Sequence, residues 1–135
     1  MQGFKRNVKV GRSIIDYCLK CVREEVLLEV KSAVMKVGEY AMYPDYPSPR
    51  GRRHLEDIKV EKGGRGGIVF ITTLPGVTFF TPNRFADPEM YRLLVKAERA
   101  GVNIKAVSMH YDPSPSFIYL DDPELDVVFN RRGGL

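Results

Sequence analysis

The sequence predicts a mixed α/β fold, in which a central β-sheet is flanked by helices in the order β-β-β-α-β-α-β. Three observations predict it. Segments rich in β-branched and apolar residues recur along the chain, two segments carry helix-start signals, and glycine and proline separate the elements. With 135 residues the chain has the length of one domain, predicted over 1–135, with a loosely ordered tail over 121–135.

The first three predicted strands span residues 4–10, 13–20 and 25–35. The connection KCVREE between the second and third is short, so these two strands are expected to form an antiparallel hairpin. The third strand, EVLLEVKSAVM, is expected to be central because it is rich in apolar and β-branched residues. The predicted core positions of the hairpin are Ile15, Tyr17, Leu28 and Val30.

One glycine and three prolines predict a loop over 37–49. Ser48 is then a suitable N-cap and Pro49 a suitable first residue for a helix that runs to about Lys62. The GGRGG segment is expected to end this helix, and GIVFITT, residues 67–73, predicts a buried strand. An irregular stretch is expected over 74–86.

A second helix is predicted to start at Asp87 and Pro88 and to end at Gly101. Its apolar residues recur with the i, i+3, i+4, i+7 spacing of a helix face: Met90, Leu93, Leu94 and Ala97. A strand over 102–108 follows, and short strands are expected near 117–120 and 126–129.

Composition excludes several classes of protein. Hydrophobic residues make up 44% and charged residues 28% of the chain, which is typical of globular rather than disordered proteins. The chain lacks an apolar run of about 20 residues and an apolar signal segment, so we expect a cytoplasmic location without a membrane partner. Cys18 and Cys21 lack the further ligands that a structural zinc site needs. The net charge of +4 permits a polyanionic partner, and basic residues gather in 1–12 and 50–65.

The candidate chemical site is the set Asp16, Glu29 and Lys31. Glu29 and Lys31 lie two apart on one predicted strand and therefore share a face, and the expected hairpin register brings Asp16 to that face. Two carboxylates and the Val30 carbonyl would suit Mg²⁺ or Mn²⁺, and Lys31 would orient a water molecule or stabilise developing charge. An acid followed by Glu-x-Lys on the next strand is the layout of PD-(D/E)XK nucleases. The alternative is a salt bridge at the edge of a sheet.

Further motifs carry a resemblance to a known family. They are Ser13-Ile14-Ile15-Asp16-Tyr17, Glu29-Val30-Lys31-Ser32, Tyr43-Pro44-Asp45, Arg50-Gly51, Arg53-His54-Leu55 and Pro82-Asn83. In this order they resemble the signature of the sugar fermentation stimulation protein A family.

The resemblance implies a restriction-endonuclease-like, PD-(D/E)XK core that binds nucleic acid, DNA more readily than RNA, and hydrolyses phosphodiester bonds. It also leaves two alternatives: a DNA-binding regulator of sugar (maltose) metabolism that does not cleave, or an interaction module that needs a partner. Family members carry an N-terminal OB-like domain that has no counterpart here, so the expected partners also include such a domain or a second copy of the chain.

The remaining candidates lie after the Glu-x-Lys strand. Asp45 is expected either to approach the site as an accessory acid or to cap a proline-rich turn. Arginines at a helix N-terminus suit phosphate. The predicted nucleic-acid contacts are Arg50, Arg52, Arg53 and His54, with packing beside Leu55 and Ile58 as the alternative for His54.

Overall fold

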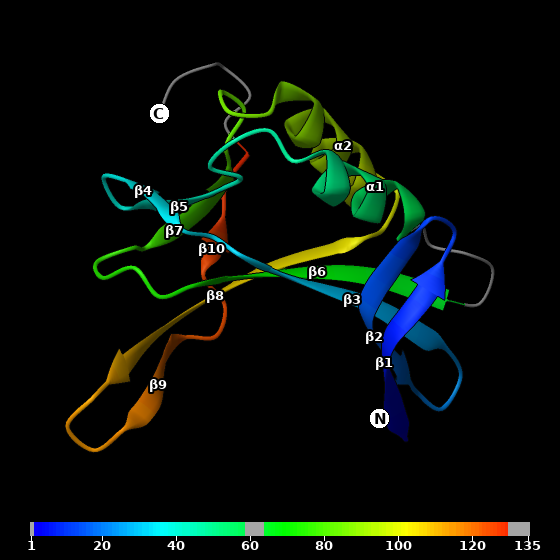
Figure 1. The fold of residues 1–135 in the computed structure, drawn as a ribbon, viewed down its shortest axis with the longest axis horizontal. Coiled ribbons are helices and arrows are strands. Elements are labelled where there is room, and N and C mark those ends of the chain that lie inside the picture. The colour runs from blue at the N-terminus through cyan, green and yellow to red at the C-terminus, as the bar shows by residue number, and fades with distance from the viewer. Residues whose placement is uncertain (1, 59–63, 130–135) are drawn as a thin grey trace.

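The computed structural model describes residues 2–58 and 64–129. Its larger sheet has six strands and is mixed, as predicted (Figure 1). In spatial order these are β1 (Gly3–Val10), β2 (Ser13–Lys20), β3 (Glu25–Ser32), β6 (Gly64–Thr72), β8 (Asn103–Asp112) and β9 (Phe117–Asp122). Within the described ranges, no helix is long and apolar enough to cross a membrane.

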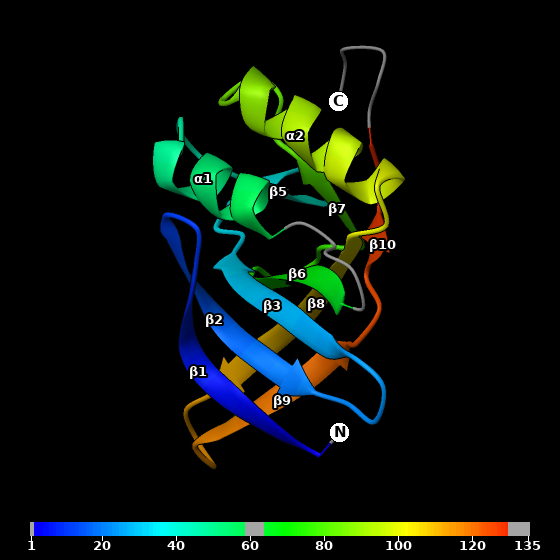
Figure 2. The same ribbon diagram turned by 90° about the vertical axis from the view of Figure 1, so that its right-hand side faces the viewer.

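The two helices connect the parallel strands of this sheet. The strands β3, β6 and β8 are parallel, whereas the pairs β1–β2, β2–β3 and β8–β9 are antiparallel. The helices α1 (Pro49–Asp57) and α2 (Pro88–Arg99) lie together over one face, as Figure 2 shows. The predicted order β-β-β-α-β-α-β is therefore confirmed for the first strands and the crossovers of the larger sheet.

A second, smaller sheet was not predicted. Its strands are, in spatial order, β10 (Asp126–Val127), β7 (Phe79–Pro82), β5 (Tyr40–Tyr43) and β4 (Met35–Val37). The expected loop over 37–49 and the irregular stretch over 74–86 are therefore wrong in part. Gly38, with φ +58°, permits the tight turn between β4 and β5, and the prolines begin after β5 ends. Because β5 pairs with the distant β7, local sequence does not reveal it.

The helix starts are confirmed. The N–H of Gly51 donates to Ser48 Oγ at 3.2 Å, and the N–H of Met90 donates to Asp87 Oδ1 at 3.0 Å. The expected end of the first helix is wrong, because α1 ends at Asp57 and the expected last residue, Lys62, lies outside the described residues. The C-terminal tail expected over 121–135 includes the end of β9 and all of β10, and residues 130–135 lie outside the description.

The core lies between the helices and the larger sheet. The Phe70 ring stacks on Phe80 at a centroid distance of 4.3 Å, and Leu94 is fully buried. The prediction that Leu28 and Val30 point into this core is wrong, because both are half-buried. The covered face of β3 instead carries Glu29 and Lys31, whose parallel neighbours on β6 are the buried Ile68 and Phe70. The hairpin core prediction holds for Ile15, which is fully buried, but Tyr17 is only half-buried.

Residues 64–67 of the glycine-rich segment belong to a strand, because β6 begins at Gly64 rather than at the expected residue 67. A Cβ atom added at Gly66 would lie 2.5 Å from the backbone oxygen of Ile58, at the end of α1. A Cβ atom at Gly67 would meet the Leu28 side chain at 3.4 Å. The glycine at position 66 thus lets α1 end close against the sheet.

Replacing Gly66 with alanine should therefore lower the free energy of unfolding by about 2 kcal/mol, because a backbone oxygen cannot move aside cheaply. Gly67→Ala is the matched control and should cost less, since its neighbour is the end of a flexible side chain. Urea denaturation of both variants measures the difference, and equal effects would contradict the steric explanation.

Candidate functional site

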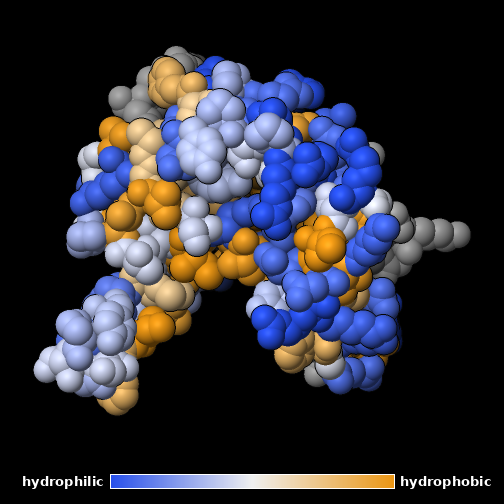
Figure 3. Space-filling model, viewed as in Figure 1, coloured by the Kyte–Doolittle hydropathy of each residue, from blue (hydrophilic) through white to orange (hydrophobic). Residues whose placement is uncertain are grey.

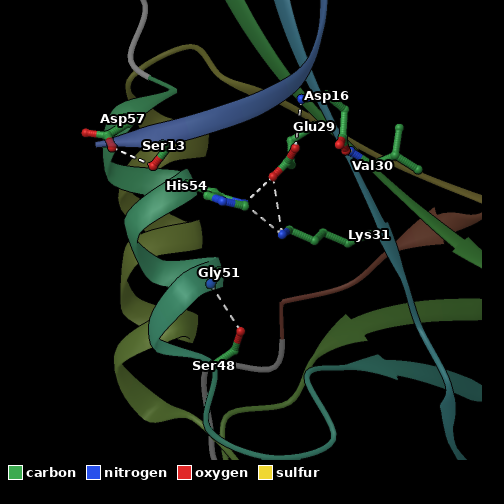
Figure 4. A network of polar contacts seen from close by, with 9 residues as sticks. All are labelled: Ser13, Asp16, Glu29, Val30, Lys31, Ser48, Gly51, His54 and Asp57. Carbon is green, nitrogen blue, oxygen red and sulfur yellow. Dashed lines mark hydrogen bonds and ion pairs between the residues drawn. The ribbon is translucent and has the colours of Figure 1, made fainter. Parts of the chain in front are cut away.

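The site begins where β2 and β3 separate. Their backbone pairing runs from Lys20–Glu25 to Tyr17–Leu28, and next come Asp16 and Glu29. Here side chains bond to backbone groups: the N–H of Asp16 donates to Glu29 Oε1 at 3.1 Å, and the N–H of Val30 donates to Asp16 Oδ2 at 2.9 Å. Each carboxylate is thus held by the opposite strand, as Figure 4 shows.

The burial pattern of β2 changes at this point. Its buried residues are Ser13, Ile15 and Cys18, so the two-residue alternation of a strand changes phase around Asp16. On β1, the residue between the pairs Arg6–Tyr17 and Val8–Ile15 is Asn7, with a φ of +55°. A backbone conformation that few residues adopt therefore lies beside Asp16.

Glu29 is the most deeply buried member of the site, with 2% of its surface exposed. Its Oε2 atom lies 3.2 Å from Lys31 Nζ and contacts His54 Nδ1, while Lys31 Nζ lies 3.0 Å from the same nitrogen. Figure 4 shows these three side chains converging between β3 and α1. Among the described residues, none forms a hydrogen bond of good geometry to Oε2.

Burial controls the electrostatics of this cluster. It raises the pKa of Glu29 to about 7; the neighbouring Asp16 carboxyl adds to the increase and Lys31 opposes it. Burial also lowers the pKa of His54, and the positive charges of Lys31 and Arg50 lower it further. The histidine is therefore neutral at pH 7, and Glu29 titrates near neutrality.

The contacts of His54 Nδ1 compete with one another. A neutral imidazole nitrogen either accepts a hydrogen bond or donates one. Nδ1 can accept from the Lys31 ammonium or donate to an ionised Glu29, but it cannot do both. A cation beside Glu29 Oε2 would remove this competition.

The structure brings three predicted site residues together, Asp16, Glu29 and Lys31, and adds His54 to them. One of the two predicted roles of His54 was a contact with nucleic acid at the surface. The residue is instead buried and faces Glu29. Sequence reasoning missed this contact: His54 stands in the Arg53-His54-Leu55 motif, but its neighbours depend on how α1 is seated.

The other predicted residues lie elsewhere. Arg52 donates from Nη1 to Asp87 Oδ2 at 2.6 Å and thereby joins α1 to α2. Arg50 and Arg53 are exposed on α1. The exposed Asp45 lines a different pocket, with Met35, Met42 and Asn83 among its walls, so the structure does not bring it to the two acids.

Two residues that the sequence analysis named but did not assign to the site complete its surroundings. Tyr43 and Met90 line a small cavity together with Glu29, Lys31 and His54. A Cβ atom on Gly51 would lie 2.7 Å from the Tyr43 hydroxyl and 2.8 Å from the Met90 methyl group. Glycine at this position therefore lets α1 approach the site closely.

The donor set suits a hard cation that retains water. In the described ranges, no group of three or more His, Cys, Asp or Glu side chains is placed to hold a metal. Asp16 and Glu29 supply two carboxylates, however, and Mg²⁺ is often bound by one or two carboxylates together with several waters. The Glu29 oxygen that lacks a well-formed hydrogen bond fits this role. Val30 gives its N–H to Asp16, and its carbonyl remains a predicted ligand.

A mixed sheet with two crossover helices, and an acid on β2 opposite Glu-x-Lys on β3, define a protein of restriction-endonuclease-like fold. The chain matches the family described as "Sugar fermentation stimulation protein RE domain" over residues 1–115. It therefore belongs to the sugar fermentation stimulation protein family.

Similar proteins support this assignment. The chain is 48% identical to a sugar fermentation stimulation protein homolog of Pyrococcus furiosus over 117 residues, covering 85% of this chain and 51% of that protein. It is 42% identical to a homolog of Archaeoglobus fulgidus, covering 92% and 53%. A solved structure of Pyrococcus furiosus SfsA in complex with Ca²⁺ superimposes with a TM-score of 0.87 at 42% identity, covering 94% of this chain and 56% of that one. The chain thus spans about half the length of the relatives it matches.

Proposed function

We propose that this domain binds nucleic acid and hydrolyses phosphodiester bonds with Mg²⁺ or Mn²⁺ held by Asp16 and Glu29. The observation that carries the proposal is the pair of carboxylates held where β2 and β3 separate, with Lys31 beside them. A buried Glu29 beside the half-buried Asp16 is unfavourable unless a cation neutralises the pair. The Ca²⁺ in the description of the Pyrococcus furiosus relative also supports a divalent cation.

Each residue of the site has a distinct task. A divalent cation held by Asp16 and Glu29 would supply an activated water and would neutralise charge on the phosphate. The Lys31 ammonium is suited to orienting that water or to stabilising charge that develops on the phosphate oxygens. His54, neutral and buried, positions Lys31 by accepting a hydrogen bond from it. Asp16 and Glu29 are held in place because each carboxylate accepts a hydrogen bond from a backbone N–H group of the opposite strand.

The test is a cleavage assay of the purified chain on single- and double-stranded DNA and RNA. Each substrate is incubated with Mg²⁺, Mn²⁺ or EDTA. Cleavage that requires either metal and stops in EDTA is expected. Intact substrates under every condition would contradict the proposal.

A second candidate function, DNA binding without cleavage, is favoured by the burial of Glu29. Its carboxylate is 2% exposed beneath α1, so a substrate phosphate reaches it only if α1 or its side chains move. A regulator of sugar metabolism, or a module completed by a partner, would bind nucleic acid in EDTA and leave it uncut. The same cleavage assay separates this candidate from the nuclease.

Binding should weaken as salt rises, because contacts between cations and phosphates release counterions. Arg53 is exposed on α1, whereas Arg52 is paired with Asp87. Arg53→Ala should therefore make the slope of log affinity against log salt less steep by roughly 0.7–0.9, which is the contribution of one phosphate contact. Fluorescence anisotropy in EDTA between low and physiological salt measures it, and an affinity independent of salt would contradict a nucleic-acid surface. Gln2→Ala, at an exposed uncharged position, is the control and should leave the slope unchanged.

A further inference from the structure

The hairpin formed by the end of β8 and by β9 projects from the body of the molecule. We call residues 109–120 the β8–β9 arm. Figure 1 shows the arm pointing away from the helices, and Figure 3 shows a hollow between it and the β1–β2 side of the molecule. Four consecutive apolar residues of β9 are exposed on this arm: Phe117 at 60%, Ile118 at 69%, Tyr119 at 42% and Leu120 at 59%.

One face of the arm is apolar and the other carries aromatic rings together with polar groups, and exposed side chains lie on both. Ile118 pairs with Tyr111, which is also exposed, and makes one face. On the other face Tyr119 pairs with His110, and their rings stack at 5.1 Å. His110 Nδ1 also lies 2.8 Å from Asp121 Oδ1, so the arm has a defined shape of its own. An exposed apolar patch of this kind is typical of an interaction surface.

The two edges of the larger sheet differ in a way that points to pairing at β9. The edge strand β1 carries exposed Lys5, Arg6 and Lys9, and such charges discourage association between sheets. The edge strand β9 has no charge or proline over its first four residues. Its outer N–H and C=O groups pair with no other described strand. An uncharged, apolar edge of this kind is a template for another strand.

We propose that the β8–β9 arm is the surface through which two copies of this chain associate, with β9 pairing antiparallel to β9 of the second copy. A two-fold axis at Tyr119 would place Ile118 of each copy opposite Leu120 of the other. The acidic residue Asp121 would then lie opposite Phe117 of the other copy, so that the two acidic ends are kept apart. Strand addition would join the two larger sheets into one.

Pairing at β9 would bring the four exposed side chains of residues 117–120 in each copy beside those of the other copy, whereas Tyr111 on β8 lies one strand away. At their degree of exposure these four side chains offer roughly 350–575 Å² per copy, of which only the part facing the partner strand is buried. The interface is therefore a small one, and the association should depend on protein concentration.

The test is the mass of the full chain in solution, measured by sedimentation at about 5 to 200 µM in EDTA without nucleic acid. We expect twice the 15.3 kDa of the chain at the higher concentrations, and a melting temperature that rises with concentration. The double variant Ile118→Lys, Leu120→Lys should be monomeric throughout, because lysines on an edge strand oppose pairing. Val22→Lys, at a 78% exposed position in the β2–β3 turn, is the matched control and should remain dimeric.

Circular dichroism of the variants shows whether each is folded, and the concentration dependence of the wild type keeps the test valid if the double variant is not. A wild-type chain that stays monomeric at 200 µM overturns the proposal and leaves the arm for another occupant, such as the remaining half of the relatives. A folded double variant that still dimerises also overturns it. Neither outcome bears on cleavage, so the proposed function is tested separately.

Discussion

Replacing Glu29 with glutamine is expected to reduce metal-dependent cleavage by orders of magnitude while making the metal-free fold more stable. The cleavage loss follows because an amide is a poor ligand for Mg²⁺ and the water and the phosphate both depend on that cation. The gain in stability follows because the folded protein buries an acid next to Asp16. A loss of activity together with a gain in stability is expected where a site holds an unfavourable charge for function. It is not expected where an acid only stabilises the fold.

The pH dependence of stability gives the sign of this effect. The pKa of Glu29 is about 7 in the folded protein, above its ordinary value of 4.5, mainly because of burial. The unfolded chain therefore releases this proton more readily, and the wild type loses stability as the pH rises from about 4.5 through 7. Glu29→Gln does not ionise and should gain about 3 kcal/mol relative to the wild type at pH 8, and little at pH 4. Urea denaturation in EDTA at both pH values measures this difference.

Glu25→Gln is the matched control, since it makes the same chemical change at an exposed position of the same strand. It should leave both cleavage and the pH profile close to those of the wild type. Lys31→Ala should abolish cleavage but retain metal binding, because an ammonium group is not a ligand. If Glu29→Gln cleaves like the wild type, Glu29 does not hold the catalytic cation and the assignment of the site is wrong, whereas a wild type that does not cleave favours the non-cleaving candidate.

Asp87→Ala is expected to have the largest effect on stability, a loss of about 3–5 kcal/mol. The buried Asp87 carboxylate accepts three hydrogen bonds. The donors are the N–H of Met90 at 3.0 Å, the N–H of Ser48 at 2.9 Å and the Arg52 guanidinium at 2.6 Å. It thus caps α2, holds the start of α1 and neutralises an arginine between the helices. Its removal leaves all three donors without this acceptor.

Glu89→Ala provides the control for this variant. Glu89 also lies in the first turn of α2 and also pairs with an arginine, Arg92, but on the exposed surface. Its removal should change the free energy of unfolding little. Comparable losses in the two variants, measured by urea denaturation at pH 7, would contradict the assigned role of Asp87.

The stabilising effect of Asp87 should also depend on pH. Burial favours a higher pKa for this carboxyl, but the Ser48 and Met90 N–H groups and Arg52 outweigh burial and lower the pKa below its ordinary value of 3.8. The stabilisation is therefore present above pH 4 and is lost as the pH falls through the folded-state pKa. The difference in stability between the wild type and Asp87→Ala should shrink on acidification below that point.

Local sequence was sufficient for the elements that local interactions define. Ser48 and Asp87 marked the helix starts because each supplies its own cap, and the helical spacing from Met90 to Ala97 predicted α2. The short connection after β2 predicted the hairpin, and its register brought Asp16 opposite Glu29. These features depend on residues within a few positions of one another or on a single turn.

Tertiary structure decided the rest, because it depends on contacts between distant segments. β5 and β7 became strands by pairing with each other, although prolines and glycines flank them. α1 ends at Asp57, and the backbone oxygen of the following residue, Ile58, lies close against Gly66 of the sheet. Which face of β3 is covered was also a tertiary outcome: the helices lie over the face that carries Glu29, so Glu29 rather than Leu28 or Val30 became buried.

The candidate site shows the same division. The sequence by itself determined the two acids and the lysine, because strand periodicity and one hairpin register place them together. Only the tertiary structure placed His54 against Glu29, paired Arg52 with Asp87 and left Asp45 outside. The physical reason is that the neighbours of a helical side chain depend on how the helix packs against the sheet, and that packing is determined by the core as a whole rather than by the motif that contains the residue.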